Sequence, residues 1–69
     1  MIGTVVIWSR TFGFIRPDEG SADVFLRGDL FRRGDRVSFD AVPNTWRPGQ
    51  LIARNVEVIG YGPAPRRVA

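Results

Sequence analysis

The feature that most constrains the fold is the alternation of side chains in two short runs, Phe12–Arg16 and Asp23–Arg27. Successive side chains of a β-strand point to opposite faces, so Ile15, Val24 and Leu26 fall on the faces suited to a core. The opposite faces then carry three phenylalanines and an arginine, which are Phe12, Phe14, Phe25 and Arg27. We therefore expect a sheet with an aliphatic inner face and an aromatic outer face exposed to solvent.

Three further runs extend this pattern to the whole chain and predict an all-β fold. The expected strands are Thr4–Trp8, Phe12–Arg16, Asp23–Arg27, Asp35–Val42 and Leu51–Ile59. Segments rich in proline, glycine and small polar residues separate them, which is typical of a small barrel. In the connection 28–34, Leu30 or Phe31 is available to plug the core. We expect one domain over residues 1–59 and a flexible C-terminal tail over residues 60–69.

The residue inventory excludes several classes of function. The 69 residues include no cysteine, histidine or lysine, so thiolate, zinc and histidine-base chemistry are ruled out. No nucleophile–base pair can be assembled, and the acidic residues lack the spacing of a calcium loop, so we expect no enzyme, no metal and no cofactor. The longest apolar run, Val5–Trp8, is too short to span a membrane. Met1 leads directly into a strand pattern, so we expect no signal peptide, no membrane partner and a cytoplasmic location.

The charge of the chain comes from arginine alone. Ten arginines against seven acidic residues give a net charge of +3. A guanidinium group stacks on bases and binds phosphate with two nitrogens, although a GC-rich genome also favours arginine, and both readings stay open. Rings beside guanidinium groups suit a single nucleic-acid strand, because bases stack on rings and cations neutralise phosphates.

Six short motifs occur in an order typical of a known family. They are Gly3-Thr4-Val5, Phe12-Gly13-Phe14-Ile15, Pro17-Asp18, Gly20-Ser21, Asp23-Val24-Phe25 and Asn55-Val56. Over residues 1–59 the chain resembles cold-shock domains, with their Gly-Thr-Val, Lys-Gly-Phe-Gly-Phe-Ile and Asp-Val-Phe-Val-His motifs. The resemblance implies a five-stranded antiparallel barrel of the oligonucleotide/oligosaccharide-binding (OB) type. It also implies binding of single-stranded RNA or DNA, often as an RNA chaperone, with Phe12, Phe14 and Phe25 on the base-stacking face.

The chain departs from the family pattern near this face. The Lys-Gly pair is here Arg10-Thr11, which keeps a cation and loses a glycine. The family's histidine is here Arg27, and the aromatic residue after it is Gly28. The connections after the first and third strands are shorter than usual. The aromatic residue that the second of these connections often carries has no clear counterpart, and Phe31 is a candidate.

Trp8 has two possible placements. Aligned without a gap to the family's Lys-Trp-Phe, Ile7 takes the tryptophan position and Trp8 the phenylalanine position. Strict alternation instead puts Ile7 in the core with Val5 and turns Trp8 toward the ligand. We favour the second placement, because isoleucine is the better core residue and a shorter turn permits a change of register.

The remaining aromatic candidate, Trp46, lies beside Arg47 in the loop 43–49. It is either a lid packed on the end of the barrel or a second stacking platform. The predicted nucleic-acid-binding residues are Trp8, Arg10, Phe12, Phe14, Phe25, Arg27, Phe31, Trp46 and Arg47. The alternative function is a protein-interaction module of the transcription or translation machinery, because aromatic residues and arginine also dominate protein hot spots.

Overall fold

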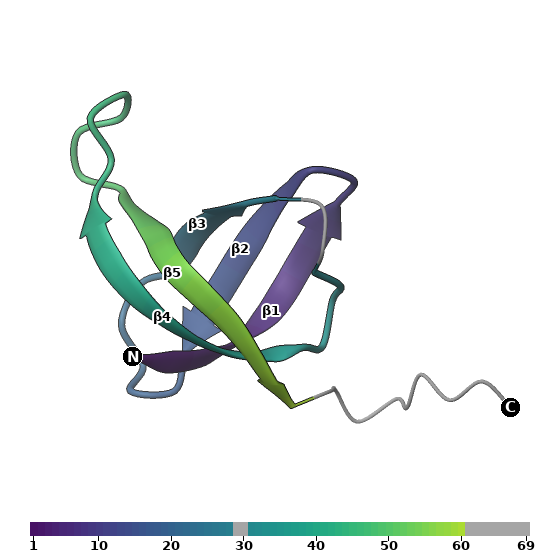
Figure 1. The fold of residues 1–69 in the computed structure, drawn as a ribbon. Helices are drawn as coiled ribbons and strands as arrows, with labels where there is room; N and C mark the ends of the chain where they lie inside the picture. Colours follow the sequence, from purple (N-terminus) through teal and green to yellow (C-terminus); the bar gives the residue numbers. More distant parts are fainter. Residues whose placement is uncertain (29–30, 61–69) are drawn as a thin grey trace, which may run out of the picture.

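The computed structural model describes residues 1–28 and 31–60, which form a closed five-stranded barrel (Figure 1). The strands are β1 (Ile2–Ser9), β2 (Phe12–Pro17), β3 (Val24–Arg27), β4 (Arg36–Pro43) and β5 (Leu51–Gly60). All five predicted strands are confirmed, with ends that differ by at most two residues. Gly60, expected in the tail, ends β5, whereas the rest of the expected tail and Leu30 lie outside the described residues.

The strand order around the barrel is β1-β2-β3-β5-β4. Neighbouring strands are antiparallel except β3 and β5, which meet in parallel where Phe25 lies opposite Ile52. The expected five-stranded barrel is confirmed, and one of its five strand contacts is parallel. The reason is geometric, because a closed ring with an odd number of strands cannot alternate in direction all the way around.

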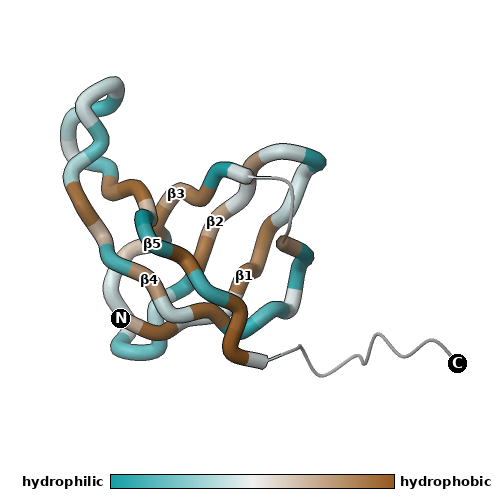
Figure 2. Tube along the Cα trace, in the orientation of Figure 1, coloured by the Kyte–Doolittle hydropathy of each residue, from teal (hydrophilic) through white to brown (hydrophobic). Residues whose placement is uncertain are grey.

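The fully buried core is aliphatic except for one aromatic residue, Phe39. The buried core comprises Val5, Ile15, Val24, Leu26, Val37, Phe39 and Ala53. Figure 2 shows hydrophobic residues along the strands and mostly hydrophilic residues in the connections. The alternation predicted for β2 and β3 is confirmed, because Ile15, Val24 and Leu26 are fully buried. Within the described residues, no helix has the length and apolar character needed to cross a membrane.

A bulge in β1 decides which of its side chains face the core. Val5 lies opposite Ile15, but the next pairing along β2 joins Phe14 to Ile7, so one residue of β1 is extra. A bulge of this kind reverses the inward–outward alternation beyond it. Ile7 consequently shares the outer face with Phe14 and is 51% exposed. Trp8 lies opposite Gly13 and packs against the core.

The placement of Trp8 on the ligand face is therefore wrong, and the gapless alignment gives the observed arrangement. The Trp8 ring meets Phe31 edge-on, with ring centroids 5.9 Å apart and an interplanar angle of 73°. Both rings are partly buried against the core. Phe31 is thus the core plug that the sequence offered for the connection 28–34, and it shields Trp8 from solvent.

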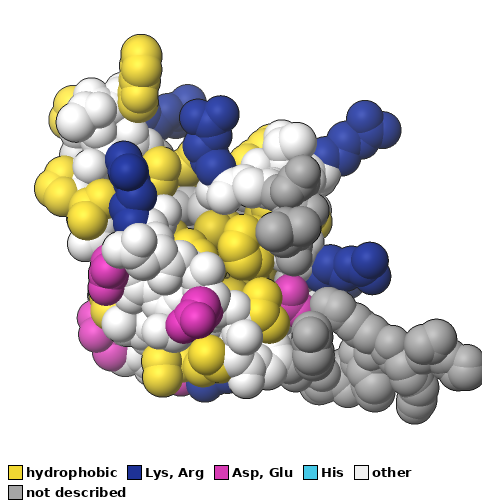
Figure 3. All heavy atoms as spheres, viewed as in Figure 1, with side chains coloured by type: hydrophobic (Ala, Val, Ile, Leu, Met, Phe, Trp, Pro, Cys, Tyr) yellow, Lys and Arg dark blue, Asp and Glu magenta, His cyan; other side chains and the backbone are white. Residues whose placement is uncertain are grey.

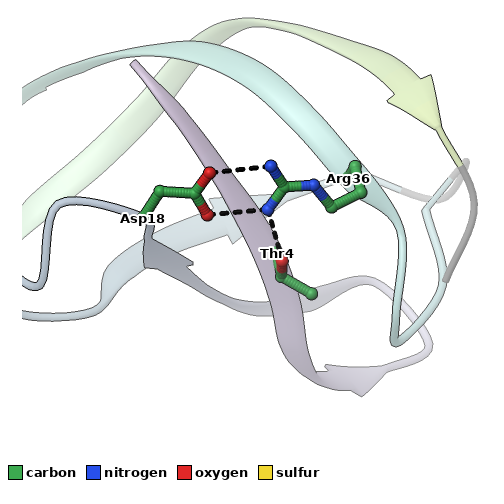
Figure 4. A network of polar contacts seen from close by, with 3 residues as sticks. All are labelled: Thr4, Asp18 and Arg36. Carbon is green, nitrogen blue, oxygen red and sulfur yellow. Dashed lines mark hydrogen bonds and ion pairs between the residues drawn. The ribbon is translucent and has the colours of Figure 1, made fainter. Parts of the chain in front are cut away.

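An ion pair joins β4 to the turn after β2 (Figure 4). Arg36 donates from Nη1 and Nη2 to the two carboxylate oxygens of Asp18, each at 2.7 Å. Nη1 also donates to the hydroxyl oxygen of Thr4 in β1, at 3.0 Å. The hydrogen bonds from Arg36 lower the pKa of Asp18.

Gly13→Ala should destabilise the barrel by about 1–3 kcal/mol, because an added methyl group overpacks a filled site. The new Cβ would overlap the carbonyl oxygen of Ile7 and lie 2.6 Å from Cε3 of Trp8. Urea unfolding measures the loss. Gly60→Ala is the control, since its Cβ would lie 3.6 Å from the nearest atom, in Arg36. Equal losses in the two variants would contradict the tight Trp8–Gly13 packing.

Asp18→Asn should lower stability at neutral pH and matter less in acid. A carboxyl group whose pKa is lowered by folding stabilises the protein above its ordinary pKa of about 3.9, and that contribution is lost as pH falls further. The difference in unfolding free energy between wild type and Asp18→Asn should therefore shrink as the pH is lowered through this range. Glu19→Gln is the control, because exposed Glu19 makes no hydrogen bond with the described residues. A pH-independent difference would argue against the Arg36 contact.

Candidate functional site

A groove of about 440 Å³ runs between the outer faces of β2 and β3 and the β4–β5 loop. Its lining includes six of the nine residues predicted from the sequence, which are Phe12, Phe14, Phe25, Arg27, Trp46 and Arg47. Asn44, Gln50 and Ile52 complete it and were not predicted. One signal for Asn44 was available, because asparagine at the start of a turn commonly binds the backbone two residues on.

The floor of the groove is a cluster of three phenylalanine rings on adjacent strands. Phe14 lies directly opposite Phe25, and Phe12 lies opposite Arg27, so these side chains share the outer face. The Phe12 and Phe25 rings stack with centroids 6.0 Å apart and an interplanar angle of 29°. Phe14 meets Phe25 edge-on at 5.6 Å. The predicted facing of these rings is confirmed, and Phe12 is 41% exposed.

The β4–β5 loop forms the opposite wall and is held together by its own hydrogen bonds. The backbone N–H of Asn44 donates to the Gln50 carbonyl at 2.9 Å, and the N–H of Gln50 donates to the Arg47 carbonyl at 3.1 Å. The Asn44 side chain is buried and accepts from the Trp46 N–H at 2.9 Å. These contacts fix the backbone that carries Trp46 and Arg47. The loop projects beyond the strands of the barrel (Figure 1).

The structure excludes one of the two interpretations of Trp46. Its side chain is 87% exposed, so it is not a lid packed on the end of the barrel. It lines the groove together with Arg47, and its role as a second stacking platform stays a prediction.

Three predicted residues lie outside the groove. Trp8 and Phe31 pack on each other against the core. Arg10 is exposed at the two-residue turn between β1 and β2, with φ 42°. Conversely, Ile7 was missed as an outer-face residue, although the gapless alignment had placed it there.

The arginines divide into engaged and free groups. Arg16 binds Asp23 at 3.3 Å and Arg36 binds Asp18, so these two are neutralised locally. The arginines that make no ion pair with described residues are Arg10, Arg27, Arg32, Arg33, Arg47 and Arg54. In Figure 3, most of the visible arginine side chains project near the β4–β5 loop and along the right-hand edge, whereas acidic side chains lie lower. Two of the free arginines, Arg27 and Arg47, line the groove itself.

The groove offers aromatic faces and cations. Among the described residues, no group of three His, Cys, Asp or Glu side chains is placed to hold a metal ion. A site with exposed rings and guanidinium groups favours flat, anionic ligands, because the rings stack and the guanidinium groups bind anionic oxygens.

Comparison with known proteins adds two relatives, whereas no family model matches the chain. A protein named "Probable cold shock protein" from Sinorhizobium fredii is 35% identical over 65 residues, covering 80% of this chain and 93% of the relative. Cold shock protein CspA of Rhizobium meliloti is 36% identical over 64 residues, covering 78% of this chain and 91% of the relative. Both alignments are longer than the part of this chain that they cover, so they contain gaps in this chain.

Proposed function

The chain belongs to the cold-shock protein family, and we propose that it binds single-stranded RNA or DNA with low sequence specificity. The observation that carries the proposal is the cluster of phenylalanine rings that forms the floor of an open groove between unpaired arginines. Exposed rings cost free energy unless a ligand covers them. Bases cover such rings by stacking, with little dependence on sequence, because every base has an aromatic face.

In this proposal the groove binds a strand through two kinds of contact. Bases stack on Phe12, Phe14 and Phe25, and Trp46 supplies a further ring from the loop. Arg27 and Arg47, which line the same groove, neutralise phosphates beside the stacked bases. Arg10 extends the positive surface along the strand. Trp8 and Phe31 contribute indirectly, by packing on each other against the core beside Gly13 of β2.

Binding of this kind is non-covalent and requires no cofactor. A strand held on the rings cannot pair with a complement at the same time. The protein therefore shifts weakly paired RNA toward the unpaired state, which is the action of an RNA chaperone. Structured segments with few base pairs should open first, because each stacked base offsets only about 1–3 kcal/mol.

Phe14→Ala or Phe25→Ala should weaken binding of a short single strand by about 1–3 kcal/mol each, the usual worth of one stacked base. Stability should suffer less than affinity, because both rings are only half-buried. Anisotropy of a labelled oligonucleotide gives the affinity, and thermal melting gives the stability. Val24→Ala is the contrasting variant. Because Val24 is fully buried, its truncation should lower the stability more than the affinity. A large loss of stability in the phenylalanine variants with unchanged affinity would contradict the proposal.

Affinity should fall with salt as expected for a few phosphate contacts. Three or four contacts predict a slope of log affinity against log salt of about −2 to −3, or roughly 20- to 60-fold between ~50 and ~200 mM. Arg27→Ala should make the slope shallower by about 0.7. Arg16→Ala is the control, because Arg16 is engaged with Asp23. Absence of strand binding at low salt, or a slope near zero, would favour the protein-interaction function.

A further inference from the structure

The second half of β5 has a strand partner on one side only. On that side β4 pairs with β5 as far as Gly60. On the other side β3 meets β5 only where Phe25 lies opposite Ile52, and Figure 1 shows β5 continuing well beyond β3. Among the described residues, no other strand and no loop backbone is hydrogen-bonded to this side of residues 53–60. The stretch is therefore an edge that can pair with a further strand.

A bulge in β5 brings two opposite charges to the same face of this edge. Arg54 lies opposite Asp40 and Glu57 lies opposite Ser38, so three steps along β5 match two steps along β4. The extra residue is accommodated beside Asn55, which has a φ of 54° and donates from Nδ2 to Asp40 Oδ2 at 2.9 Å. In a regular strand, side chains three residues apart point to opposite faces. Because of the bulge, Arg54 and Glu57 both point outward, and both are exposed.

Neither charge is neutralised within the described part of the chain. Arg54 makes no ion pair or hydrogen bond there, and the Asp40 carboxylate across from it accepts from the Asn55 amide instead. Glu57 likewise has no ion-pair or hydrogen-bond partner in residues 1–28 and 31–60. Val58, on the inward side of the same edge, is 37% exposed. The edge thus leaves a cation, an anion and an apolar side chain open to one complementary strand.

We propose that this edge of β5 pairs in antiparallel orientation with β5 of a second copy of the chain, forming a two-fold symmetric dimer. A two-fold axis beside Asn55 puts Arg54 opposite Glu57 of the partner subunit, and Glu57 opposite the partner's Arg54. At the next position, Val58 lies opposite the partner's Ala53, which covers the exposed valine.

The bulge is what permits this register. A symmetric antiparallel pair matches only positions that share a face, and Arg54 and Glu57 share one because of the extra residue between them. A register centred on Arg54 or on Glu57 would instead place like charges directly opposite each other, which is destabilising. The sequence of the edge is therefore complementary to itself in the register centred between these two residues.

The dimer should be weak and should not grow into larger assemblies. The new pairing is bounded at one end by Ile52, where β3 occupies the edge, and at the other by Gly60, where β5 ends. A contact this short falls below the roughly 1,200–2,000 Å² of stable interfaces, so we expect micromolar to millimolar dissociation constants. Each copy uses its edge once, so the contact closes on itself and cannot propagate into a fibre.

The test measures the mass of the full chain without nucleic acid, so its outcome is independent of the function proposed above. Sedimentation equilibrium at low salt should show the wild type moving from the 7.7 kDa monomer toward twice that mass between about 10 µM and about 1 mM. Glu57→Arg places two guanidinium groups opposite each other on both sides of the axis, and Arg54→Glu places two carboxylates there. Each variant should dimerise roughly 10- to 30-fold more weakly. A wild type that stays monomeric over this range, or single variants that dimerise like it, would overturn the proposal.

Mixing the two single variants tests the register itself. In a mixed dimer, the carboxylates of the Arg54→Glu chain face the guanidinium groups of the Glu57→Arg chain on both sides of the axis. The equimolar mixture should therefore dimerise about as tightly as the wild type, whereas each variant alone should not. Both variants keep a net positive charge, so overall attraction between them cannot produce this result. A mixture that associates no more tightly than the separate variants would overturn the pairing of Arg54 with Glu57.

A double variant and a matched control separate this pairing from damage to the fold. The double variant Arg54→Glu/Glu57→Arg exchanges the two charges and should regain wild-type dimerisation, which a misfolded chain could not do. Glu19→Arg is the control, because Glu19 carries the same charge, is exposed in the turn after β2 and forms no ion pair with described residues. It should dimerise like the wild type. Equal weakening in Glu19→Arg and Glu57→Arg would show that net charge governs association, and would overturn the proposal.

Discussion

Val5 and Trp8 both pack toward the barrel interior, an arrangement that a regular strand cannot produce for residues three apart. The bulge in β1 makes it possible by adding one residue between the two. The cross-strand contact that follows depends on Gly13, whose missing side chain leaves room for the Trp8 ring. Trp8 in turn packs on Phe31, which closes the end of the core near the connection 31–35.

The arginines differ in whether an acidic side chain neutralises their charge. Arg36 and Arg16 are paired with acidic residues around the turn between β2 and β3, where the Arg36–Asp18 contact ties β4 to that turn. These exposed pairs contribute little individually, but they neutralise the positive charge of two arginines that do not line the groove. Arg27 and Arg47 have no such partner among the described residues and line the groove itself. Two of the free cations thus lie where the rings are exposed.

The ring surface is displaced from β1 toward the β4–β5 loop. Ile7 stands on the outer face beside Phe14, at the position that the gapless alignment gives to the family's tryptophan, and an aliphatic side chain cannot stack a base. Trp46 adds a ring on the other side of Phe12 and Phe25, across the groove. A loop residue is usually too mobile to serve as a fixed platform, but here the buried Asn44 binds the backbone of Trp46 directly. The short hydrogen-bonded loop therefore provides a second wall for the site.

The sequence by itself determined the five strands, the inward position of Ile15, Val24 and Leu26, and the outward position of Phe12, Phe14 and Phe25. These follow from local alternation, which depends only on the geometry of the strand. Tertiary structure decided which way Ile7 and Trp8 face. The bulge depends on the packing of Trp8 against Gly13 and Phe31, and the alternation of residue types in the sequence does not show it. Tertiary structure also decided the parallel contact of β3 with β5, which closure of an odd-numbered ring imposes. The meeting of Trp46, Arg47 and Gln50 with rings some twenty or more residues away likewise required the closed barrel, since no periodicity links a loop to distant strands.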